Sequence, residues 1–128
     1  MRIEHLAINV EEPTKMVNWY VKHLGMTVVR ANHDANETHF ILDEGGKVVL
    51  EVYNNPASPL PDYRGMNPLM FHIAFAVEDI EAAHAQLAAA GASPEGAINA
   101  TPAGDRLAFL RDPWGVPLQL AKRATPLL

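Results

Sequence analysis

The sequence predicts an α+β fold made of two tandem βαβββ modules. Two observations carry this prediction. Residues 3–10 and 69–77 alternate apolar and other side chains with a period of two, which is typical of strands with one buried face. Each stretch then runs into an acidic turn, an amphipathic helical segment and a glycine. The chain has 128 residues, 48% of them hydrophobic and 20% charged, so it fits one domain with its own core.

The two opening strands carry a histidine at the same place. When the two periodic patterns are aligned, His5 corresponds to His72, and both lie on the face opposite the large apolar side chains. A lone histidine in a strand is usually structural or solvated, but a pair related by an internal repeat is harder to explain in that way.

The helices that follow have matching signals at both ends. Pro13 suits the first turn of the first helix, and Asp79 suits the N-cap of the second. Gly25 and Gly91 suit the position just after a helix, where the backbone turns left-handed. Each module therefore begins with a strand, a helix and a glycine in the same order.

Three further strand-like stretches follow in each half, separated by Gly-rich or Pro-rich turns. They cover residues 26–32, 38–43 and 47–53, then 97–101, 106–111 and 116–122. Module one thus spans about residues 1–54, a Pro-rich linker about 55–68, and module two about 69–123. We expect the two sheets to form a curved mixed-sheet cup with the helices on its outer face.

Polar residues in the last strand of each half give the candidate site. Glu51 and Gln119 sit mid-strand among apolar residues and are repeat equivalents if the turn length slips by one residue. On the concave side of a cup, they would join His5 and His72. Two imidazole nitrogens and two side-chain oxygens suit Zn, Ni, Co, Mn or Fe(II). Two structural explanations stay open: a salt bridge from Glu51 to Arg106 or Arg64, and a cross-strand hydrogen bond from Gln119.

The amino-acid composition limits which binding partners and which cellular compartment we expect. The chain has no cysteine, so thiolate sites are excluded and any metal must use N and O ligands. The net charge is −5 without a Lys/Arg cluster, which argues against nucleic acid. No segment is apolar enough to span a membrane, and we expect a cytoplasmic protein with a small-molecule substrate. Side chains that could line its pocket are Tyr53, His39, Phe109 and Tyr63.

These residues resemble the vicinal oxygen chelate superfamily, the glyoxalase, bleomycin-resistance and extradiol-dioxygenase group, over nearly the whole chain. The resemblance lies in residues 3–8, 71–75 and 109–120, the last being similar to a Phe-x-x-Asp-Pro-x-Gly turn that leads to a Glu strand. It implies a homodimer with metal ligands at His5, Glu51, His72 and Gln119. Family enzymes commonly have Glu at the position of Gln119, so Glu51 is the carboxylate left to act as the catalytic base.

Three functions follow as expectations. The leading one is a metal-dependent lyase, isomerase or epimerase in which the ion chelates a carbonyl or vicinal-oxygen substrate and Glu51 moves a proton. The second is an Fe(II) ring-cleaving dioxygenase, because His5, His72 and Glu51 make a two-histidine, one-carboxylate set. The third is a metal-free small-molecule binding or antibiotic-resistance protein.

Overall fold

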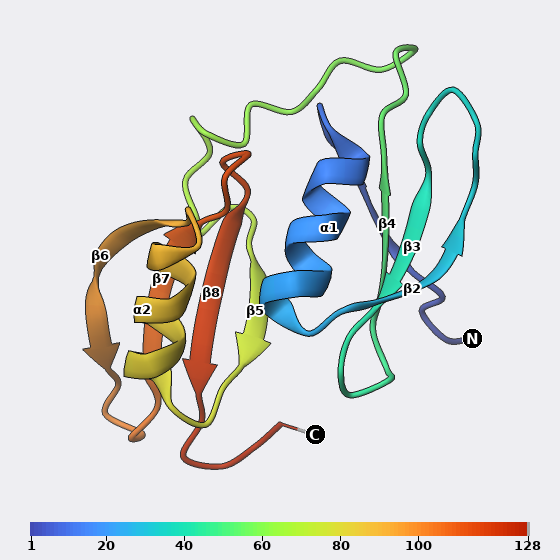
Figure 1. Cartoon of the computed structure of the whole chain (residues 1–128). Coiled ribbons are helices and arrows are strands. Elements are labelled where there is room, and N and C mark those ends of the chain that lie inside the picture. Colours follow the sequence, from blue (N-terminus) through green and yellow to red (C-terminus); the bar gives the residue numbers. More distant parts are fainter. Residues whose placement is uncertain (128) are drawn as a thin grey trace. The chain divides into compact units, whose positions relative to one another are not determined.

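Each half of the chain forms its own mixed four-stranded sheet with one helix, as expected of tandem βαβββ modules (Figure 1). The computed structural model describes residues 1–127. The chain divides into two units, Met1–Pro61 and Asp62–Leu128, and this boundary falls inside the Pro-rich segment 55–68. The α+β prediction is confirmed. Within residues 1–127, no helix is long and apolar enough to cross a membrane.

Module one follows the order strand, helix and three strands. Its elements are β1 (Leu6–Asn9), α1 (Pro13–Leu24), β2 (Thr27–Ala31), β3 (His39–Leu42) and β4 (Val49–Tyr53). The sheet order is β1-β4-β3-β2, with β1 parallel to β4 and the other neighbours antiparallel. The last strand of the module therefore lies at the centre of the sheet, beside the first.

Module two repeats this arrangement. Its elements are β5 (Ile73–Ala76), α2 (Ile80–Ala89), β6 (Ser93–Ala100), β7 (Arg106–Arg111) and β8 (Pro117–Lys122). The sheet order is β5-β8-β7-β6, and β5 and β8 are the parallel pair. The position of β8 thus corresponds to that of β4.

The core of each module lies between its helix and one face of its sheet. The side chains under 4% exposed come from alternate strand positions and from the apolar stripe of each helix. In module one they include Ile8, Met16, Val17, Tyr20, Ile41, Leu50 and Val52, and in module two Ile80, Leu87, Ala108, Leu110, Leu118 and Leu120. Because strand side chains alternate, Glu51 and Gln119 belong to the opposite face of their sheets.

The helix ends follow the sequence signals. Pro13 begins α1, and Gly25 ends it in the left-handed conformation with φ 67°. The Asp79 side chain caps α2 by accepting a hydrogen bond of 2.9 Å from the Ala82 N–H. Gly91, with φ 105°, follows the last turn of α2.

Strand boundaries differ from the expectation in two places. The stretch predicted at 97–101 belongs to a strand that starts at Ser93, because Ser93 and Pro94 pair with Arg111 and Leu110 on β7. Proline is tolerated there because β6 is an edge strand. The opening strands are shorter than predicted, and His5 and His72 each lie one residue before β1 and β5.

Candidate functional site

Module one brings His5 and Glu51 together on the sheet face that α1 does not cover. On β4, Glu51 pairs with Ala7 on one side and with Phe40 on the other. His5, two residues before Ala7, extends over this face, and its Nε2 lies 3.2 Å from Oε2 of Glu51. The His5 ring meets the Phe40 ring edge-on, with centroids 5.7 Å apart and an interplanar angle of 80°. The two side chains thus form a polar pair against an aromatic wall.

Carboxylates contact both ring nitrogens of His5. The Glu4 carboxylate contacts Nδ1, and that of Glu51 faces Nε2. The hydrogen bond with Glu4 raises the pKa of His5, desolvation opposes this, and the charges of Glu4 and Glu51 raise it further. In the absence of a metal, these contacts stabilise the doubly protonated imidazolium. The predicted alternatives for Glu51 have other partners, since Arg106 pairs with Glu81 and Arg64 donates to the Pro113 carbonyl.

Module two has the same arrangement with an amide in place of the carboxylate. On β8, Gln119 pairs with Ala74 and with Phe109, as Glu51 pairs with Ala7 and Phe40 in module one. The His72 ring, two residues before Ala74, meets the Phe109 ring edge-on at 5.3 Å and 80°. The register therefore makes Gln119 the structural equivalent of Glu51, with no slippage.

The tautomer of neutral His72 is set by a main-chain contact. Its Nδ1 lies 2.7 Å from the carbonyl oxygen of Pro68. A carbonyl oxygen can only accept, so Nδ1 carries the hydrogen and Nε2 keeps its lone pair. This is the form of histidine that binds a metal through Nε2.

Gln119 is buried, with 8% of its surface exposed. Within residues 1–127 its side-chain amide makes no hydrogen bond, so the cross-strand bond considered above is not formed there. Its amide atoms are not fully enclosed by the protein, so they remain accessible to a ligand on this face.

The four residues expected to line a pocket lie in different places. Tyr53 follows Glu51 by two residues on β4 and shares its face, and Phe109 packs against His72. His39 pairs with Val52 on the face that α1 covers, and its Nδ1 lies 2.6 Å from the Glu37 carbonyl oxygen. Tyr63 is 9% exposed, and its ring lies 6.3 Å from that of Phe71. His39 thus does not accompany Glu51.

Each module by itself offers an incomplete ligand set. Among residues 1–127, no group of three or more His, Asp or Glu side chains is close enough to hold an ion. Module one supplies the imidazole of His5 and the carboxylate of Glu51, and module two supplies the imidazole of His72 and the amide of Gln119. We call these two pairs half-sites.

Sequence reasoning missed three groups that support the half-sites. Phe40 could have been found, because it is the repeat equivalent of Phe109 in the strand before Glu51. Glu4 was visible beside His5, but in an ideal strand it would point to the other face. The Pro68 carbonyl belongs to the main chain, so no side-chain pattern indicates it.

Comparison with known proteins agrees with this architecture. The profile of the family described as "Glyoxalase/Bleomycin resistance protein/Dioxygenase superfamily" matches residues 2–120. The chain is 28% identical over 120 residues to the uncharacterized protein YwkD of Bacillus subtilis, covering 92% of this chain and 94% of that protein.

Two solved structures have the same fold. The glyoxalase family protein from Enterococcus faecalis is 31% identical, with a TM-score of 0.72, and the match covers 94% of this chain and 97% of that one. TnmS3, an antibiotic binding protein from Streptomyces sp. CB03234, is 22% identical, with a TM-score of 0.71 and coverage of 97% and 99%.

Proposed function

This chain belongs to the Glyoxalase/Bleomycin resistance protein/Dioxygenase superfamily, and we propose that it is a divalent-metal-dependent lyase, isomerase or epimerase. Its substrate would be a small molecule with a carbonyl group or two vicinal oxygens. One observation carries the proposal: the two half-sites occupy equivalent register positions, and in one of them His5 Nε2 faces Glu51 Oε2 at 3.2 Å.

The donor atoms fit a divalent ion of the Zn, Ni, Co, Mn or Fe group. We propose that the two half-sites together supply His5, Glu51, His72 and Gln119 to one ion, which gives two nitrogen and two oxygen donors. The Pro68 carbonyl contacts Nδ1 of His72, and the Glu4 carboxylate contacts Nδ1 of His5, so in both residues Nε2 is the nitrogen that would bind the metal. Such outer partners orient histidine ligands and raise their basicity. The metal also requires His5 to lose its Nε2 proton.

The bound ion would supply Lewis acidity toward the substrate oxygens. Among the four proposed ligands, Glu51 is the only group that can accept a proton beside a carbonyl and return it. Gln119 is neutral, so the set carries one negative charge and favours an anionic substrate oxygen at a divalent ion. Phe40 and Phe109 provide apolar walls, and Tyr53 shares the Glu51 face for contact with substrate.

Metal analysis of the purified protein tests this function. We expect the wild-type protein to retain close to one divalent ion per proposed site, and Glu51→Ala to lose most of it. His39→Ala is a matched control, because it removes a potential ligand from the opposite face of the same sheet. Equal and negligible metal in wild type and Glu51→Ala would contradict the proposal. We also expect a homodimer, which light scattering measures.

A metal-free binding protein is the second candidate function. It is favoured by the position of His5 between the carboxylates of Glu4 and Glu51, which satisfies the pair electrostatically without an ion. The fold is also that of TnmS3, an antibiotic binding protein. A cationic aromatic dye serves as the probe. Affinity that survives chelator treatment and Glu51→Gln would favour this second function over the first.

A further inference from the structure

We infer that Arg111 is a positioning residue for His72, acting through the segment 63–68 that precedes β5. Arg111 lies on β7, two residues after Phe109, so it shares the sheet face of Gln119. Within residues 1–127, its polar contacts are with the Glu95 carboxylate and with main-chain carbonyls, not with the proposed ligands. The inference deepens the proposed function and rests on it for the role of His72 as a ligand.

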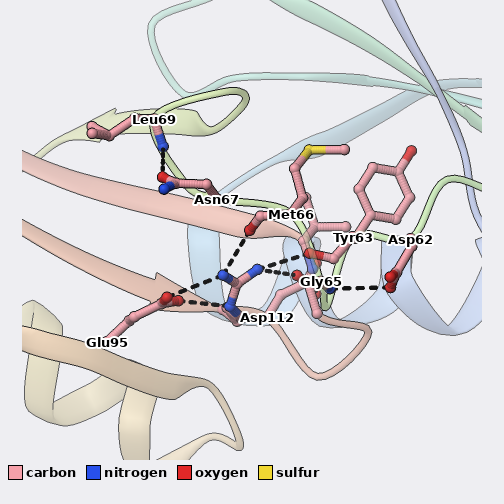
Figure 2. Close-up of polar contacts among 11 residues, drawn as sticks. Asp62, Tyr63, Gly65, Met66, Asn67, Leu69, Glu95 and Asp112 are labelled. Carbon is pink, nitrogen blue, oxygen red and sulfur yellow. Dashed lines mark hydrogen bonds and ion pairs between the residues drawn. The ribbon is translucent and has the colours of Figure 1, made fainter.

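The guanidinium group of Arg111 binds both a side chain and the main chain. Its Nε lies 2.6 Å from Oε2 of Glu95, and its Nη2 lies 3.1 Å from Oε1 of the same carboxylate. Nη1 donates to the Tyr63 carbonyl at 2.7 Å and Nη2 to the Met66 carbonyl at 2.8 Å. Figure 2 labels Tyr63, Met66 and Glu95, which supply these acceptor groups. Nη1 also lies 3.3 Å from the Gly115 carbonyl oxygen. The side chain is 16% exposed.

The held segment leads directly to the contact that orients His72. Two residues after Met66, the Pro68 carbonyl accepts the Nδ1 hydrogen of His72 at 2.7 Å. Asn67 stabilises the turn between them, because its side chain accepts from the Leu69 N–H at 2.9 Å and its carbonyl accepts from the Met70 N–H at 2.9 Å. The position of the Pro68 carbonyl therefore depends on a short turn, and Arg111 fixes the start of this turn through its hydrogen bond to Met66.

Glu95 makes this anchor specific for arginine. A carboxylate bound by two nitrogens fixes the plane of the guanidinium, so the remaining N–H groups point at the carbonyls of Tyr63 and Met66. Lysine would keep the charge but lacks this planar fork. Glu95 also pairs in register with Phe109, whose ring contacts His72. Both partners of the ion pair are thus linked to the surroundings of His72.

The first readout needs no metal. The metal-free protein is measured at about pH 8.5, two units above the ordinary histidine pKa of about 6.5. Long-range ¹H–¹⁵N spectra then identify the tautomer of each imidazole. The signal that is missing from His72→Gln is assigned to His72. We expect wild-type His72 to carry its hydrogen on Nδ1, and Arg111→Met to give a mixture of tautomers. Arg106→Met is the control, because it removes an Arg–Glu pair from the same strand without touching the segment 63–68.

The second readout is affinity for Co²⁺, followed by its visible spectrum. Arg111→Met should weaken Co²⁺ binding by about 10–100-fold, the usual effect of losing an outer partner of a ligand, and Arg106→Met should not. If Arg111→Met does not fold, Arg111→Lys replaces it, with an intermediate effect on both readouts. A merely structural role would lower the melting temperature and leave the tautomer unchanged.

Two results separate this inference from the proposed function. A wild-type tautomer and wild-type Co²⁺ affinity in both Arg111 variants would overturn the inference while the metal function stands. A changed tautomer in Arg111→Met, together with no Co²⁺ binding in the wild-type protein, would support the positioning of His72 and remove the metal function.

Discussion

The Nε2 atom of His5 lies 3.2 Å from the Oε2 atom of Glu51, across the parallel pair of strands β1 and β4. This is the direct contact between two proposed ligands within module one. The first prediction therefore concerns Glu51→Gln, which keeps the shape of the side chain and removes its charge. We expect affinity for Zn²⁺ or Co²⁺ to fall at least about 100-fold, because even outer partners of ligands contribute about 10–100-fold. Isothermal titration calorimetry on metal-stripped protein measures this.

The control for Glu51→Gln is Glu44→Gln, which removes the same charge from an exposed turn of the same module. Its metal affinity should match that of wild type. If the two variants bind equally well, then Glu51 is not a ligand, whatever the activity of the protein.

Gln119 gives the second prediction. It occupies in β8 the register position that Glu51 occupies in β4, but it is neutral. Gln119→Glu adds a negative charge to the proposed ligand set, so we expect divalent-metal affinity to rise roughly tenfold, or about 1.4 kcal/mol. Gln86→Glu adds the same charge on an exposed part of α2 and should leave the affinity unchanged. Unchanged or weaker binding by Gln119→Glu would exclude Gln119 from the set.

The third prediction concerns stability at low pH. Asp43 directly follows β3, and its carboxylate accepts hydrogen bonds from the N–H groups of Val48, Lys47 and Gly45 at 2.6, 2.8 and 3.1 Å. Partial burial acts to raise the pKa of Asp43, but these N–H donors outweigh it and lower the pKa below its usual 3.8. The stabilisation of the folded state by ionised Asp43 is therefore fully present above the usual pKa of 3.8. It is lost as the pH falls through the lower folded-state pKa.

Asp43→Asn should accordingly lower the free energy of unfolding by about 1 kcal/mol at neutral pH. The difference from wild type should shrink toward zero as the pH falls through the lowered folded-state pKa of Asp43, because the wild-type carboxylate then also becomes neutral. Urea denaturation at several pH values measures this, with the exposed neighbour Glu44→Gln as the control. A deficit that persists unchanged at low pH would mean that the charge of Asp43 contributes nothing.

The sequence was sufficient for the fold because local and periodic signals agree in both halves. Pro13 and Gly25 bound α1, and alternation along β4 and β8 identifies the buried face. The equivalence of Glu51 and Gln119 also followed from the repeat, and the registers with Ala7 and Ala74 make it firm. A duplicated pattern is informative since each half tests the interpretation of the other.

The contacts that orient the proposed ligands could not be predicted from the sequence, for physical reasons. His72 is oriented by a main-chain carbonyl, and every residue of the chain carries such a group whatever its side chain. Arg111 looks like an ordinary charged residue at a strand end, and only the path of segment 63–68 brings two carbonyls to it. The face of His39 depends on the register between β3 and β4, which side-chain alternation alone does not give, and the register pairs His39 with Val52 rather than with Glu51.

The fourth prediction tests the turn between β7 and β8, which contributes to holding segment 63–68. Gly115 has a φ of 89°, and a Cβ there would collide with the Arg64 side chain and come within 3.3 Å of the Arg64 Cα. Arg64 in turn donates to the Pro113 carbonyl at 2.7 Å. Gly46 is the matched control, since its φ is 68° and no neighbouring atom would lie within 4 Å of an added Cβ.

Gly46→Ala should cost about 1–2 kcal/mol, the ordinary cost of a left-handed conformation for a residue with a Cβ. Gly115→Ala carries the same conformational cost and must also displace Arg64, so we expect it to be more destabilising by at least about 1 kcal/mol. Urea unfolding midpoints compare the two variants directly. Equal losses would mean that segment 63–68 yields to the methyl group at no cost, and that its packing on the turn is loose.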